Sequence, residues 1–200
     1  MKGQINLGTT AGDMIFQIAK RDDINSIVEI GTWNGLGSTM CVIEAIKESK
    51  NKSFTSLELY PEMYELAKQN LGSNLQFVNL LNGRIIEYDE VFWFDHSIIN
   101  FDDDGHARLY YKTDLEHLKS SNNVLDKFPE KIDFLILDGG EYTTFPEWQK
   151  LKSRTKIVAL DDSNILKTSK IREQLINDDE YIKIFDDLTY RNGFTVFEKK

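Results

Sequence analysis

The segment from Ile27 to Glu48 constrains the fold of this 200-residue chain more than any other part of its sequence. The β-branched run Ile27–Ile30 is typical of a buried strand, and a loop with three glycines follows it. Ser38 is a suitable N-cap for a helix that the sequence predicts from Thr39 to about Glu48. A strand, a glycine loop and a helix in this order present backbone N–H groups to a nucleotide-like ligand. The segment therefore predicts an α/β fold with a ligand site at the glycine loop.

Two acids qualify what that ligand is. Glu29 lies within the first strand, where a carboxylate would repel a pyrophosphate and favour a cationic ligand. Glu58 ends a second predicted strand, 54–58, and Pro61 then opens a helix over 61–71. An acid at the end of the second strand is where a carboxylate holds a ribose diol. The two acids together predict a cationic nucleoside as the ligand.

Composition limits the other classes of function. Two hundred residues with 40% hydrophobic content make one domain, 1–200, with a substantial core. The net charge of −9, without a basic cluster, argues against a nucleic-acid partner. No apolar run is long enough to cross a membrane, and no signal peptide is recognised. The single cysteine, Cys41, is expected in the core, and we expect a cytoplasmic protein.

Strands and helices are predicted to alternate along the chain and to end in a hairpin. The predicted strands cover 26–30, 54–58, 75–80, 132–137, 156–160, 181–185 and 193–198, and further helices cover about 11–20 and 169–177. The Asn192-Gly193 pair indicates a turn between antiparallel strands at the sheet edge. We expect a Rossmann-like sheet of seven strands, mostly parallel with an antiparallel C-terminal hairpin, and helices on both faces.

The interval 84–131, between the third and fourth strands, is too long for one helix. Its aromatic residues argue against disorder. We interpret the interval either as a cap over the second molecule that the site would bind, called the acceptor here, or as the contact between two copies of the chain in a homodimer. Aromatic faces are expected to hold the acceptor, from Trp93, Tyr110, Tyr111, Tyr142 or Trp148.

Acids also follow the fourth and fifth strands. Asp138 and Glu141 come after the strand 132–137, and Asp161 with Asp162 follows the next one. The carboxyl ends of parallel strands share one edge, so these acids are expected to converge there. Three oxygen ligands, Asp138, Asp161 and Asp162, suit Mg²⁺ or Mn²⁺. Without a metal, Asp138 and Glu141 would lie beside the reacting hydroxyl, and both versions stay open.

The first strand and glycine loop resemble motif I of class I S-adenosylmethionine (SAM)-dependent methyltransferases, in which an acid and two glycines follow an apolar strand. Glu29, Gly31 and Gly35 fit that motif, and Glu58–Met63 resembles the second acidic motif of the family. The resemblance covers nearly the whole chain. It implies SAM as the cofactor, bound by Glu29, Gly31, Thr32, Trp33, Gly35, Ser38, Glu58, Leu59 and Asp138.

The acids after strands four and five resemble the metal set of the catechol O-methyltransferase group and of metal-dependent sugar O-methyltransferases. Glu141 stands where those sugar enzymes often carry a histidine base, so the resemblance implies Asp138 and Glu141 as catalytic residues. The segments 138–144 and 160–167 look most like small methyltransferases that decorate glycans, some acting on rhamnose. The resemblance thus implies methyl transfer to a sugar or glycan hydroxyl.

Other functions remain as alternatives. The acceptor is equally open to a phenol or another small molecule, and a non-catalytic methyltransferase-like binding domain is the non-enzyme alternative. A short-chain dehydrogenase also fits the glycine spacing, but its Tyr-x-x-x-Lys pair should lie far downstream. Here Tyr64 and Lys68 fall on the very next helix.

Overall fold

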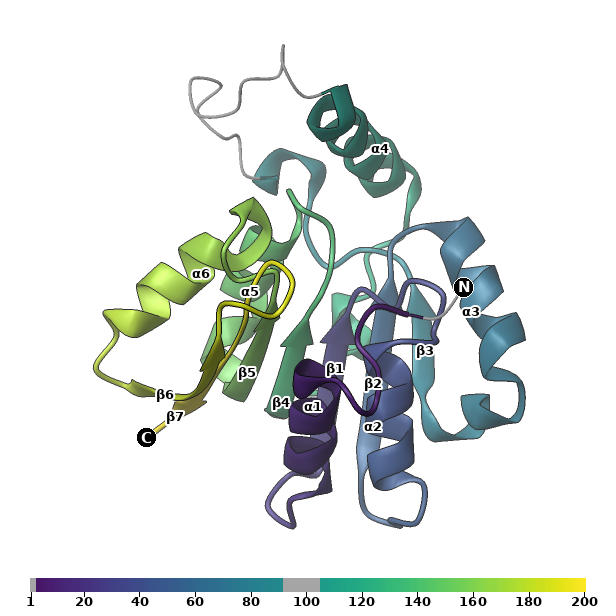
Figure 1. Cartoon of the computed structure of the whole chain (residues 1–200). Helices are drawn as coiled ribbons and strands as arrows, with labels where there is room; N and C mark the ends of the chain where they lie inside the picture. The colour runs from purple at the N-terminus through teal and green to yellow at the C-terminus, as the bar shows by residue number, and fades with distance from the viewer. Residues whose placement is uncertain (1–2, 92–104) are drawn as a thin grey trace.

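Seven strands form a single sheet in the order β3-β2-β1-β4-β5-β7-β6 (Figure 1), in a computed structural model that describes residues 3–91 and 105–200. Neighbours from β3 to β5 pair in parallel, whereas β7 pairs antiparallel with both β5 and β6. The strands are β1 Ser26–Ile30, β2 Ser53–Glu58, β3 Asn79–Asn82, β4 Ile132–Leu137, β5 Thr155–Asp161, β6 Tyr181–Asp187 and β7 Phe194–Lys199. The expected sheet, with its antiparallel C-terminal hairpin, is confirmed.

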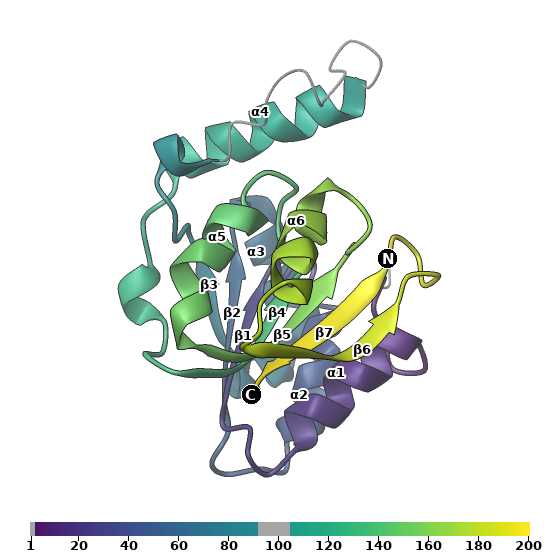
Figure 2. The same cartoon turned by 90° about the vertical axis from the view of Figure 1, so that its left-hand side faces the viewer.

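Helices cover both faces of the sheet (Figure 2). One hydrophobic cluster joins the sheet to α1 and α2, and a second joins its other face to α5 and α6. The helices are α1 Thr10–Lys20, α2 Ser38–Ile46, α3 Pro61–Leu71, α4 Gly105–Ser120, α5 Thr144–Leu151 and α6 Leu166–Ile176. The result is a three-layer α/β arrangement in which the sheet is buried on both sides.

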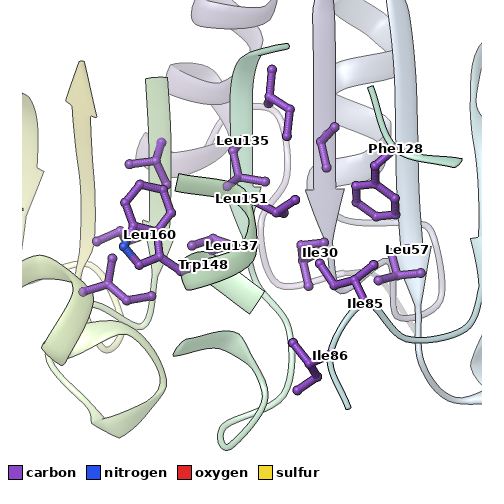
Figure 3. Close-up of a cluster of buried hydrophobic side chains, with 14 of the residues drawn as sticks. Ile30, Leu57, Ile85, Ile86, Phe128, Leu135, Leu137, Trp148, Leu151 and Leu160 are labelled. Carbon is purple, nitrogen blue, oxygen red and sulfur yellow. The ribbon is translucent and has the colours of Figure 1, made fainter. Parts of the chain in front are cut away.

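The side chains of the central strands point alternately to the two faces of the sheet, which explains why both clusters form. In β4, Leu135 and Leu137 belong to the cluster on the α5 face, whereas Phe134 and Ile136 belong to the cluster on the α1 face. Figure 3 shows part of the cluster on the α5 face, where Trp148 and Leu151 of α5 pack over Leu137. Successive side chains of a strand point to opposite faces, so a continuous apolar run fills both.

Most elements differ from the predicted bounds by one to three residues, and two of the differences have a clear physical reason. The third strand, expected over 75–80, is Asn79–Asn82, because a 3₁₀ segment, Gly72–Phe77, continues the chain after α3. The second helix begins one residue earlier than predicted, with Gly37 as its N-cap and without a side-chain cap. Ser38 is therefore not the cap, since its hydroxyl donates to Glu29 at 2.6 Å instead.

The described part of the interval 84–131 contains α4, which lies across the edge of the sheet at which the parallel strands end (Figure 2). Residues 92–104, including Trp93, fall outside the described ranges. Among the helices that the structure describes, none combines the length and apolarity needed to cross a membrane.

Candidate active site

Gly31 brings three strands together at the edge where the site forms. Its N–H donates to the carbonyl of Leu57 at 2.9 Å, and the N–H of Asp138 donates to the carbonyl of Ile30 at 2.9 Å. Gly31 has a φ of +95°, and a Cβ there would lie 2.1 Å from the Asp138 carbonyl oxygen. Only glycine fits both the left-handed backbone and this close approach.

Gly35 has a different role from the one expected. It also has a positive φ, +76°, but a Cβ there would meet the side chains of Leu71 and Ala67 at 3.1 to 3.3 Å. Gly35 thus faces α3, away from both ligand pockets described below. Gly35, which the resemblance places among the cofactor-binding residues, is not among the described residues that line either pocket.

Glu29 is also turned away from the pockets. Its carboxylate is fully buried and accepts hydrogen bonds from the hydroxyls of Ser38, Thr39 and Ser56 at 2.5 to 2.7 Å. Burial raises the pKa of Glu29, against the effect of these three donors. Glu29, expected to face a cationic ligand, is not among the described residues that line the two pockets; it instead fixes the start of α2 against β1 and β2.

Glu58 lies where the sequence predicts it, at the end of β2 and in the wall of a pocket. One carboxylate oxygen accepts the N–H of Trp33 at 2.6 Å, and the other accepts the N–H of Tyr60 at 2.9 Å. Burial raises the pKa of Glu58 to about 7. The two backbone donors fix the carboxylate in one orientation, which suits recognition of a diol.

Two adjoining pockets lie along the ends of β1, β2 and β4. They share Gly31, Trp33 and Asp138. The first pocket includes the expected residues Glu58 and Leu59, and the second includes Thr32 and Ser38 with the N-terminal segment 3–5. Their shared residues place the two pockets side by side along this edge of the sheet.

Helix α4 contributes to the first pocket through Asp114. The Tyr60 hydroxyl donates to Oδ1 of Asp114 at 2.5 Å, and the Tyr60 ring stacks on His117 with centroids 4.3 Å apart. Burial raises the pKa of Asp114 to about 6. The loop that follows β2 thus holds α4 over the pocket.

Glu147 of α5 is a further buried acid at this pocket. Burial first, and the negative charge of Asp114 second, raise its pKa to about 8. Its Oε2 has no hydrogen-bond partner among the described residues. Neither Glu147 nor Asp114 was singled out from the sequence, because the pattern that predicts a strand-end acid does not extend to acids within helices.

The aromatic residues expected at the acceptor divide into three groups. Trp148 and Tyr142 are almost fully buried in the hydrophobic core, and Tyr111 packs edge-on against Tyr142 with centroids 5.0 Å apart. Tyr110 is exposed on α4, whereas Trp93 lies outside the described residues. The expectation that Trp148 and Tyr142 hold the acceptor is therefore wrong, because both rings are buried in the core that packs against the sheet.

The acids after β4 and β5 converge as expected. One oxygen from each of Asp138, Asp161 and Asp162 lies within 4.8 Å of the others. Glu141 is half-buried nearby, where its charge contributes to the raised pKa of Asp114, but it is not among the described residues that line the two pockets.

Two cations enter this acidic cluster, defined here as Asp138, Asp161 and Asp162. Lys167 of α6 forms ion pairs with all three acids, and Arg191 of the β6–β7 loop lies 3.3 Å from Asp161. Burial lowers the pKa of Lys167, but the three carboxylates outweigh it and the net shift is upward. Burial raises the pKa of Asp162, but the charge of Lys167 and its hydrogen bond outweigh burial, and the net shift is downward.

Sequence reasoning missed both cations. The helix is predicted to begin near residue 169, whereas α6 begins at Leu166 and carries Lys167 at its second position. Arg191 carries no local signal, since only the folding of the hairpin brings it to the acids.

No protein-family model matches the sequence, and a search of curated proteins finds no match either. Solved structures do match, and the class that they define is that of O-methyltransferases with a Rossmann-like sheet. One is the O-methyltransferase from Bacillus cereus in complex with S-adenosylhomocysteine (SAH). It aligns with a TM-score of 0.62 and 14% identity, over 98% of this chain and 83% of that chain.

Two further structures carry a bound cofactor or its product. The O-methyltransferase TomG from Streptomyces achromogenes, involved in tomaymycin synthesis and solved with SAM, has a TM-score of 0.60 and 14% identity. That alignment covers 98% of this chain and 82% of TomG. The SAH-bound methyltransferase PaMTH1 from Podospora anserina has a TM-score of 0.63 and 13% identity, covering 96% and 80%. At these identities the likeness establishes a shared fold.

Proposed function

We propose that the chain is a SAM-dependent O-methyltransferase. The observation that carries the proposal is the fixed Glu58 carboxylate in the wall of a pocket beside the glycine loop. The shared fold with cofactor-bound O-methyltransferases supports the same cofactor.

The two pockets suit the two ends of SAM. The first takes the adenosine, with both ribose hydroxyls donating to Glu58, and its apolar wall includes Ile30 and Leu57. The second takes the amino-acid end, beside the N-terminus of α2. No side chain caps that helix end, so its first N–H groups can donate to the carboxylate of the ligand. Asp138, which lines both pockets, then lies beside the cationic centre of SAM.

The reaction is an in-line displacement at the methyl carbon. An acceptor oxygen forms a bond to the methyl group as the carbon–sulfur bond breaks, and the hydroxyl proton passes to a base. Asp138 and Glu141 are the proposed groups beside the acceptor hydroxyl. One oxygen of Asp138 already accepts a hydrogen bond from Lys167, so its other oxygen is the one open to the acceptor.

For the acceptor, we propose a neutral hydroxylated molecule. A sugar or glycan hydroxyl is the more specific form of this proposal, supported only by the resemblance of the segments 138–144 and 160–167 to glycan-modifying enzymes. A phenol or another small molecule is the alternative. The acidic chain, with its net charge of −9, favours a neutral over an anionic acceptor.

Titration calorimetry with SAH tests the cofactor. We expect Glu58→Ala to weaken SAH binding by roughly 1–3 kcal/mol, about 5- to 150-fold, because both ribose hydroxyls lose their acceptor. Glu65→Ala, an exposed acid seven residues further along the chain, is the control and should leave affinity unchanged.

Each other outcome has a definite meaning. Equal affinity of Glu58→Ala and the wild type would remove the ribose assignment. If SAH does not stabilise the wild-type protein against thermal unfolding but NAD(P)H does, the protein would be a dehydrogenase instead. A screen of methylated products from glycosides and phenols then separates the two acceptor classes, and SAH binding without transfer to any acceptor would indicate a binding domain.

A further inference from the structure

The side chain of Lys167 ends at the centre of the acidic cluster. Its Nζ lies 2.5 Å from Oδ1 of Asp138, 2.9 Å from Oδ2 of Asp162 and 3.6 Å from Oδ2 of Asp161. Lys167 is buried, and the Thr168 hydroxyl donates to the Asp161 carbonyl oxygen at 2.7 Å, which anchors the start of α6 to the end of β5. The fold therefore fixes the position of this ammonium group.

A divalent cation does not fit beside it. Mg²⁺ needs several oxygens about 2.1 Å from a single point, and in this cluster Nζ holds the space between them. Asp162 has no oxygen left over: Oδ2 accepts from Lys167, and Oδ1 accepts from Nδ2 of Asn192 at 3.0 Å. A metal ion would also lie a few ångströms from an ammonium group of like charge.

The charges of the cluster are already largely compensated. Three carboxylates face two cations, since Arg191 approaches from the β6–β7 loop, 3.3 Å from Asp161 and 3.6 Å from Asp162. The two cations come from different parts of the fold, Lys167 from α6 and Arg191 from the β6–β7 loop. The two cations thus compensate most of the acidic charge, although Oδ1 of Asp161 has no hydrogen-bond partner among the described residues.

We propose that Lys167 takes the place of a divalent cation, so that this chain is a metal-independent member of its fold class. The acids that predict a metal site instead form an ion-pair network around a lysine. The ammonium group supplies fixed positive charge and N–H donors beside Asp138, which lines both pockets.

The binding of Mn²⁺, measured by electron paramagnetic resonance on the full chain, tests this proposal without relying on turnover. We expect that the wild type does not bind one Mn²⁺ per chain, even at Mn²⁺ concentrations that saturate ordinary carboxylate sites of proteins. A wild-type site for one Mn²⁺ per chain that Asp161→Asn abolishes would overturn the proposal. The expected result needs only the wild type, whereas Asp161→Asn must first be shown by circular dichroism to be folded, because Asp161 is buried.

Lys167→Met removes the charge while keeping an unbranched side chain, and should convert the cluster into a cation site. We expect at least tenfold tighter Mn²⁺ binding than in the wild type, and a rise in the melting temperature on adding Mn²⁺. The control, Lys170→Met, alters a lysine one turn further along α6, near Phe145, and should behave as the wild type. A folded Lys167→Met that binds Mn²⁺ no better than the control would contradict the proposal.

SAH binding measured on the same wild-type sample separates the two hypotheses. Loss of the cofactor assignment would leave the Mn²⁺ result standing, because occupancy of the cluster does not depend on a methyl donor. If Lys167→Met does not fold by circular dichroism, the wild-type titration decides. The absence of a Mn²⁺ site at the cluster supports the proposal, and a site that Asp161→Asn abolishes overturns it.

Discussion

At the scale of single residues, the site depends on which neighbour each side chain meets. Glu29 and Glu58 both follow apolar strand residues, yet Glu29 accepts three hydroxyls in the interior whereas Glu58 faces a pocket. Gly31 and Gly35 both have a positive φ, yet only Gly31 lies against the backbone of another strand end. Sequence motifs identify these residues, and contacts assign their roles.

Gly31→Ala tests the close approach. We expect it to destabilise the fold by roughly 1–3 kcal/mol more than Gly8→Ala, because its Cβ would overlap the Asp138 carbonyl. Gly8 is a matched control, since its φ of +88° is nearly the same but a Cβ there has nothing within 4 Å. Urea unfolding measures both variants, and equal losses would mean that only backbone strain matters at Gly31.

At the scale of elements, α4 is the part of the site that sequence patterns describe least. It belongs to the interval 84–131, and its contact with the rest of the site runs through Asp114 and His117 to Tyr60. That contact supports the proposal of a cap over the pocket, since Asp114 forms part of the pocket wall.

Tyr60→Phe tests the docking of α4. The substitution removes the hydroxyl that donates to Asp114 and leaves a buried carboxyl oxygen without that partner, at a cost of about 1–3 kcal/mol. We expect faster amide hydrogen exchange in residues 109–120, measured by mass spectrometry. Tyr64→Phe on α3 is the control, and unchanged exchange in Tyr60→Phe would mean that other contacts hold the helix.

At the scale of the whole molecule, buried acids make stability depend on pH. Burial raises the pKa of Asp114 to about 6, of Glu58 to about 7 and of Glu147 to about 8. The folded state therefore binds these protons more tightly than the unfolded state does. Their contribution to stability is fully present below about pH 4, where both states are protonated, and is lost as the pH rises through 6 to 8.

Thermal unfolding of the ligand-free protein should reveal this dependence. We expect the melting temperature to fall between pH 5 and pH 8, and Glu147→Gln to flatten the fall because a neutral amide has no proton to lose. The variant should gain on the wild type at pH 8 and not at pH 5. Glu173→Gln, at an exposed position, is the control, and a parallel pH profile for Glu147→Gln would show that Glu147 is not the source.

The sequence by itself determined the order of the elements, the sheet and the ligand-facing edge. These depend on local signals, namely apolar runs such as 132–137, the glycine loop, Pro61 at a helix start and the Asn192-Gly193 turn. It also identified Glu58 and the converging acids Asp138, Asp161 and Asp162, because parallel strands end at one edge whatever their side chains.

Only the tertiary structure decided what those residues contact. Trp148 could face a ligand or the core, and the sheet beneath α5 buried it. The acidic cluster could surround a metal or a lysine, and the start of α6 delivers Lys167 to its centre. Such choices depend on residues distant in the sequence, where charge and burial act through distances that a linear pattern does not contain.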